Sequence, residues 1–123
     1  MNDHLVIATG GNDTIRIYAA LSSATVETAR KIHDPWPTAI AAFGRVLTGT
    51  LITGAMSDNP YRLTVKFSGD GPLGTVLAVS NRRGEVKGYL ENPRVDLDLN
   101  SSGKLDVGAA IGSGIITVIK DYG

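Results

Sequence analysis

The stretch from Tyr61 to Ser68, YRLTVKFS, alternates apolar and polar side chains at every step. Successive side chains of a β-strand point to opposite faces, so this alternation predicts a strand with one face in the core. The turn formers GDGPLG at 69–74 end it, and the β-prone stretches TVLAVS at 75–80 and EVKGYL at 85–90 follow. The sequence therefore predicts a run of strands in this half of the chain.

Two helices are predicted upstream of these strands. Ser22 and Ser23 offer an N-cap for the first helix, which the two prolines within 34–37 end. The second helix carries an apolar stripe spaced three or four residues apart, typical of a core-facing helix: Ile40, Phe43, Leu47 and Leu51. The segment Ser57-Asp58-Asn59-Pro60 ends this helix.

The two ends of the chain are predicted to be β-structure. Residues 5–9 and 14–21 flank the turn cluster at 10–13 and indicate a hairpin. Residues 92–106 are polar and irregular, and the β-branched run 115–119 predicts a strand with both faces covered. The expected fold is one α+β domain, a mostly antiparallel or mixed sheet of about six strands with helices packed on one face.

Composition excludes several classes of protein. Twelve basic and twelve acidic residues cancel, so no global charge attracts nucleic acid or an anionic membrane. The 123 residues contain no cysteine, which excludes disulfides and thiolate chemistry within them. The amino terminus lacks a basic region ahead of an apolar stretch, so it does not resemble a secretory signal. Residues 37–56 are long enough to span a bilayer, but the central Arg45 and four threonines favour a helix of a soluble domain.

Motifs that would indicate an enzyme or a metal site fail on inspection. Ser113 lacks the glycines of a nucleophile elbow at two residues on either side. The segment 96–100 imitates the start of a calcium loop but lacks its glycine and its bidentate glutamate. His4 and His33 have no metal-ligand partner at a useful spacing. We therefore expect a protein that is not an enzyme.

One set of side chains admits a different function. Basic and aromatic residues at the polar positions of the predicted strands would form a platform for single-stranded nucleic acid if those strands share one sheet surface: Arg16, Tyr18, Lys66, Lys87 and Tyr89. The simpler interpretation is that these are the solvated positions of alternating strands. The zero net charge favours that simpler interpretation.

Several ordered motifs resemble a known family. Gly69-Asp70-Gly71-Pro72-Leu73-Gly74, with Ala42-Phe43-Gly44-Arg45 upstream and Val86-Lys87-Gly88-Tyr89 downstream, resembles the 33 kDa chaperonins, the redox-regulated holdases of bacteria. The segments 5–9, 16–19, 103–108, 112–114 and 118–121 fit the same pattern, so the resemblance runs from about Leu5 to Gly123.

The resemblance implies an ATP-independent cytoplasmic chaperone. Its amino-terminal α+β core binds unfolding clients, and a linker leads to a carboxy-terminal module whose four cysteines hold zinc when reduced. The active form is commonly a dimer. This sequence has no cysteine and stops at Gly123, so we expect residues 1–123 to be an incomplete core domain without the linker and zinc module. No cofactor is expected within it.

The leading hypothesis is a domain that holds unfolded polypeptides through apolar surface. The candidate client-binding residues lie in the two central predicted strands: Tyr61, Leu63, Val65, Phe67, Val76, Leu77 and Val79. Ordinary core packing is the competing interpretation for each, and a scaffold without client affinity is a third function. If strands beyond Gly123 complete the sheet, the bare edge predicts a homodimer or a domain-swapped oligomer. No nucleic-acid or membrane partner is expected.

Overall fold

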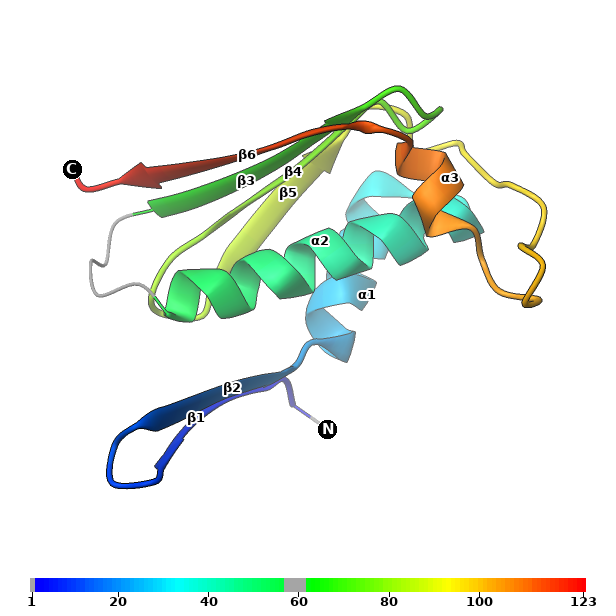
Figure 1. The fold of residues 1–123 in the computed structure, drawn as a ribbon. Helices are drawn as coiled ribbons and strands as arrows, with labels where there is room; N and C mark the ends of the chain where they lie inside the picture. Colours follow the sequence, from blue (N-terminus) through cyan, green and yellow to red (C-terminus); the bar gives the residue numbers. More distant parts are fainter. Residues whose placement is uncertain (1, 57–61) are drawn as a thin grey trace.

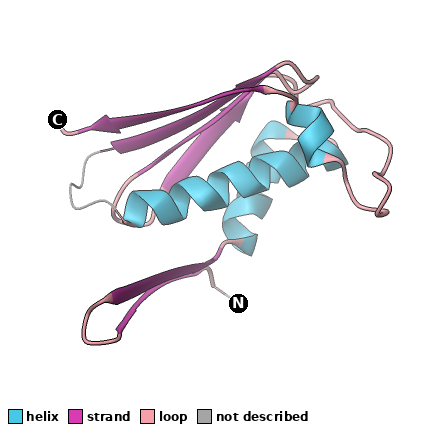
Figure 2. Ribbon diagram, in the orientation of Figure 1, coloured by secondary structure: helices cyan, strands magenta, loops and turns pink. Residues whose placement is uncertain are grey.

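The computed structural model describes residues 2–56 and 62–123 as an α+β fold (Figures 1 and 2). Along the chain its elements are β1 (His4–Gly10), β2 (Ile15–Leu21), α1 (Ser23–His33), α2 (Pro37–Ala55), β3 (Arg62–Gly69), β4 (Thr75–Ser80), β5 (Val86–Leu90), α3 (Val107–Ile111) and β6 (Gly114–Asp121). The predicted fold class and the predicted number of strands are confirmed. The segment 57–60, which was predicted to end the second helix, lies outside the described residues.

The described strands form two separate antiparallel sheets. Strands β1 and β2 make a two-stranded hairpin, which projects away from the rest of the chain (Figure 1). The other four pair in the order β5-β4-β3-β6, so the last strand lies beside the third. Consecutive hairpins join β3, β4 and β5, whereas β6 returns after the irregular segment 91–106 and α3. Strands β5 and β6 are therefore the edges of the larger sheet.

Helix α2 covers one face of the four-stranded sheet, which we call the covered face. Phe43 of α2 and Val76 of β4 are both 0% exposed, and both belong to the hydrophobic core. Gly88 on β5 lets the helix approach, because a Cβ there would lie 2.7 Å from Phe43 Cε1 and 2.9 Å from Leu47 Cδ2. The predicted apolar stripe of α2 thus packs on the sheet. Its hydropathy and length would suit a membrane span, but 56% of that window is buried in the fold.

Both long helices receive their N-terminal caps from distant segments. Ser22 is the N-cap position of α1 but makes no capping hydrogen bond with its side chain. Asp3 accepts the bonds instead, from the amides of Ala24 at 3.0 Å and Thr25 at 2.6 Å. At α2, Asp96 accepts from the amide and the hydroxyl of Thr38 at 3.3 and 2.9 Å. The prediction that a serine side chain caps α1 is therefore wrong, although the helix starts where expected.

The turn at 69–74 interlocks with the segment that enters β6. The amide of Asp70 donates to the Ser113 carbonyl at 2.9 Å, and the Ser113 amide donates to Asp70 Oδ1 at 2.8 Å. Gly71 and Gly112 meet so closely that a Cβ on Gly112 would lie 2.5 Å from the Gly71 nitrogen. Gly112 also has φ of +76°, which favours glycine. This contact fixes where β6 joins the sheet.

The last third of the chain differs from expectation in one respect and adds one helix that was not predicted. Helix α3 has only five residues, including Gly108, which show no helical period; Asp106 caps it by accepting from the amide of Ala109 at 3.0 Å. The run 115–119 does form a strand, but every residue of β6 is exposed, so neither face is covered. Since α2 packs over β3, β4 and β5, β6 lies beyond the reach of the covering helix.

Candidate functional site

The face of the four-stranded sheet opposite α2 is uncovered by the described helices, which lie on the other side (Figure 1). Residues directly opposite one another in an antiparallel pair share a face, so the strand register assigns its members. We call this surface the open face. Its members are Arg62, Thr64, Lys66, Ser68, Thr75, Leu77, Val79, Lys87, Tyr89, Ile115, Thr117, Ile119 and Asp121. An apolar sheet face without a covering layer is a surface for contact with another molecule.

Apolar side chains form the middle and one border of the open face. Leu77 and Val79 on β4 are half-buried between the neighbouring strands. Tyr89 is 50% exposed on β5, and Ile115 and Ile119 are 71% and 53% exposed on β6. This border is formed by β6, an edge strand of the sheet in the described part of the chain.

The structure divides the client-binding candidates named from the sequence. Leu77 and Val79 lie on the open face. Leu63, Val65 and Val76 point to the covered side and are 3%, 9% and 0% exposed, so they are core residues in this fold. The remaining two are Phe67, half-buried on the covered side, and Tyr61, outside the described residues. Three further residues of the open face, Tyr89, Ile115 and Ile119, were not among these candidates, because sequence pattern alone does not show which side of the sheet α2 covers.

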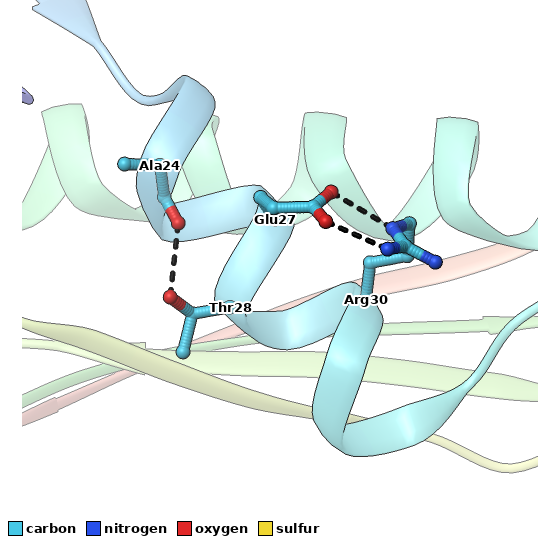
Figure 3. Close-up of polar contacts among 4 residues, drawn as sticks. All are labelled: Ala24, Glu27, Thr28 and Arg30. Atoms are coloured by element: carbon cyan, nitrogen blue, oxygen red, sulfur yellow. Dashed lines mark hydrogen bonds and ion pairs between the residues drawn. The ribbon is translucent and has the colours of Figure 1, made fainter. Parts of the chain in front are cut away.

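Apart from the open face, an apolar hollow of about 790 Å³ lies between α1 and α2. Val26, Ile40 and Ile52 line it, and Arg30 and Glu27 stand at its rim. Glu27 Oε2 and Oε1 accept from Arg30 Nε and Nη2 at 2.8 and 2.6 Å (Figure 3), and this pairing lowers the pKa of Glu27 and raises that of Arg30. Thr28 donates its hydroxyl to the Ala24 carbonyl on the same helix (Figure 3). Glu27 and Arg30 are thus paired with each other, and Arg45 is the third charged residue that lines the hollow.

The residues considered for a nucleic-acid platform do not share one sheet. Arg16 and Tyr18 belong to the hairpin, whereas Lys66, Lys87 and Tyr89 belong to the four-stranded sheet. The condition for a nucleic-acid platform, that these strands share one sheet surface, is therefore not met in the described residues, because β1 and β2 pair only with each other there. Within residues 2–56 and 62–123, no group of three or more histidine and acidic side chains is arranged to hold a metal ion.

Comparison with known proteins assigns this chain to a protein family. Residues 3–123 match the family model described as Hsp33 protein. The relatives include 33 kDa chaperonins of Geobacillus sp. (strain WCH70), 48% identical, and Enterococcus faecalis, 48% identical. Each alignment covers 100% of this chain and 42% of the relative. This chain therefore belongs to the Hsp33 family and spans less than half the length of these relatives.

A solved structure shares the fold. The crystal structure of the 33 kDa chaperonin from Thermotoga maritima superposes with a TM-score of 0.91 at 34% sequence identity. The match covers 95% of this chain and 40% of the other. The resemblance found in the sequence motifs is thus confirmed over the whole described fold.

Proposed function

We propose that this chain is the client-binding part of a redox-regulated, ATP-independent holdase of the bacterial cytoplasm, and that it is not an enzyme. The observation that carries the proposal is the open face, where the exposed side chains of Tyr89, Ile115 and Ile119 share a surface with Leu77 and Val79 and no described helix lies over them. Family membership supports the chaperone role, because the relatives are named 33 kDa chaperonins. Unfolded clients would be held and kept from aggregating.

The physical basis of binding is the removal of apolar surface from water, worth roughly 25 cal/mol per Å². This force has no direction, so many unrelated clients can be held. The hollow between α1 and α2 is lined by three charged residues, Glu27, Arg30 and Arg45, whereas apolar side chains form the centre of the open face. For these reasons we assign client capture to the open face, with Leu77 and Val79 at its centre.

This sequence contains no cysteine ligands for the zinc ion on which redox regulation would depend. Zinc held by four cysteines is what the family resemblance implies, and these 123 residues contain no cysteine. The residues present do not fit that metal, so the redox switch would have to lie in other parts of a longer protein. We propose that residues 1–123 are the core domain on which such a switch acts.

Light scattering from heat-denatured lactate dehydrogenase tests the proposal. The chain should suppress aggregation at near-stoichiometric ratios, and the double variant Leu77→Ser/Val79→Ser should lose most of this suppression. The matched control is Ile15→Ser/Ile17→Ser, which removes two exposed β-branched side chains from the hairpin. A folded wild-type chain that does not suppress aggregation contradicts the holdase function. Loss in the control alone would move the client surface to the hairpin.

A further inference from the structure

Two lysines flank the apolar centre of the open face. Lys66 on β3 is directly opposite Leu77, and Lys87 on β5 is directly opposite Val79. Strand β4 lies between β3 and β5, so the ammonium groups stand on either side of the Leu77–Val79 pair. Both lysines are exposed. The apolar centre is therefore bounded by positive charge on two sides.

These two charges are not compensated within the described residues. The open face has a third basic residue, Arg62, whose guanidinium pairs with the carboxylate of Asp121 at 3.1 Å. The amide of Gly123 and the guanidinium of Arg62 lower the pKa of Asp121, so that carboxylate is committed to these partners. Glu85 stands at the end of the face and accepts from the side-chain amide of Asn81 at 2.9 Å. Lys66 and Lys87 have no ion pair in the described part of the chain.

We propose that the open face prefers extended apolar client segments that carry two carboxylates, which pair with Lys66 and Lys87. This inference rests on the proposed holdase function and adds a substrate class to it. Charge complementarity supports it. A client with apolar residues alone would cover Leu77 and Val79 and exclude water there, but it would leave the ammonium groups of Lys66 and Lys87 without partners. A segment that places acidic groups there would keep both lysines paired while Leu77 and Val79 are covered.

The strand geometry sets the spacing of the two carboxylates. Lys66 and Lys87 are separated by two strand spacings across the sheet and two residues along it, which places their Cα atoms about 12 Å apart. An extended peptide advances about 3.3 Å per residue, so acidic residues four positions apart span about 13 Å and point to the same side. The preferred client segment therefore has five residues, with acidic residues at positions one and five, an apolar residue at position three and any residue at positions two and four.

Synthetic peptides test this preference without changing the protein. The first has nine residues with valine at positions one, five and nine, glutamate at three and seven, and threonine elsewhere. The second replaces both glutamates with glutamine. The third exchanges the residues at positions six and seven, which puts one glutamate on the opposite side at unchanged net charge. Fluorescence anisotropy with labelled peptides should give about twofold to thirtyfold tighter binding for the first than for the second. The third should be intermediate.

A pair of protein variants completes the test. Lys66→Ala/Lys87→Ala should bind the first and second peptides equally, whereas Lys31→Ala/Lys104→Ala, which removes two exposed lysines elsewhere, should keep the preference. The advantage of the first peptide should also shrink as salt rises. Equal binding of all three peptides to the wild-type chain overturns the preference and leaves the holdase function standing. No binding of any peptide, with no suppression of aggregation, overturns both. Tighter binding of a single-stranded RNA than of the acidic peptide would overturn the preference in favour of a nucleic-acid partner.

Discussion

The two faces of the four-stranded sheet are built from the same strands but have different surroundings. On β4, Val76 and Ala78 are 0% exposed beneath α2, while their neighbours Leu77 and Val79 are half-buried on the open face. Adjacent residues of one strand therefore serve two purposes, cohesion of the fold and contact with another molecule. Substitutions on the covered face should change stability, and substitutions on the open face should change binding with little effect on stability.

The largest expected effect is at Phe43, the centre of the covered face. This side chain is 0% exposed and packs edge to face on His33 with ring centroids 5.1 Å apart. Phe43→Ala should cost about 3–5 kcal/mol in urea denaturation, because it leaves a cavity under the sheet. The comparison residue is Leu77, where Leu77→Ala should cost at most about 1 kcal/mol. Equal losses at the two positions would show that the open face is itself core.

A smaller effect is expected where the covering helix α2 is anchored. Thr38 is 0% exposed, donates its hydroxyl to Asp96 and accepts from the amide of Leu97 at 2.9 Å. Thr38→Val keeps the shape and the bond from the residue-38 amide to Asp96, but it removes the hydroxyl and leaves the Leu97 amide without its partner, which should cost about 1–3 kcal/mol. Thr53→Val is the control on the same helix, since its exposed hydroxyl donates to the Gly49 carbonyl. If both variants unfold at the same denaturant concentration, the Thr38 hydroxyl contributes nothing to the anchoring of α2.

The smallest effect concerns α1 and depends on pH. Hydrogen bonds from Thr25 and Ala24 lower the pKa of Asp3 below its ordinary value of 3.8. A carboxyl group with a lowered folded-state pKa stabilises the fold above its unfolded-state pKa, and this contribution is lost as pH falls through the folded-state value. The melting temperature of Asp3→Asn should therefore lie slightly below wild type at pH 7 and converge on it in the acid range. A difference in melting temperature that stays constant from pH 7 into the acid range would contradict this contribution of Asp3.

Local patterns predicted most elements of this fold. The alternation at Arg62–Ser68 and the apolar spacing of Ile40, Phe43 and Leu47 depend on neighbours in sequence, and each matches an observed strand or helix. The two-sheet arrangement could not be read from them, because pairing of β6 with β3 joins residues about fifty positions apart. The same holds for the caps, since Asp3 and Asp96 carry no signal of the helices they serve.

The sequence predicted which residues of the candidate site share one side of a strand, but not which side of the sheet is open. Alternation showed that Leu63 and Val65 share one side and that Leu77 and Val79 share one side of the next strand. It did not show which side α2 would cover, because that depends on how a helix some twenty residues away packs. Only the strand register and the side on which α2 packs distinguished the buried Val76 from its open neighbour Leu77.

The distant cap of α2 has a consequence for biosynthesis. Asp96 follows Thr38 by 58 residues, so a growing chain makes the apolar helix long before it makes the residue that closes its first turn. At a translation rate of about 5–20 residues per second, this interval lasts roughly 3–12 s. The strands that cover Phe43 also emerge during that time. On the ribosome, the central helix of this domain is therefore itself an exposed apolar segment, the kind of polypeptide that a holdase retains.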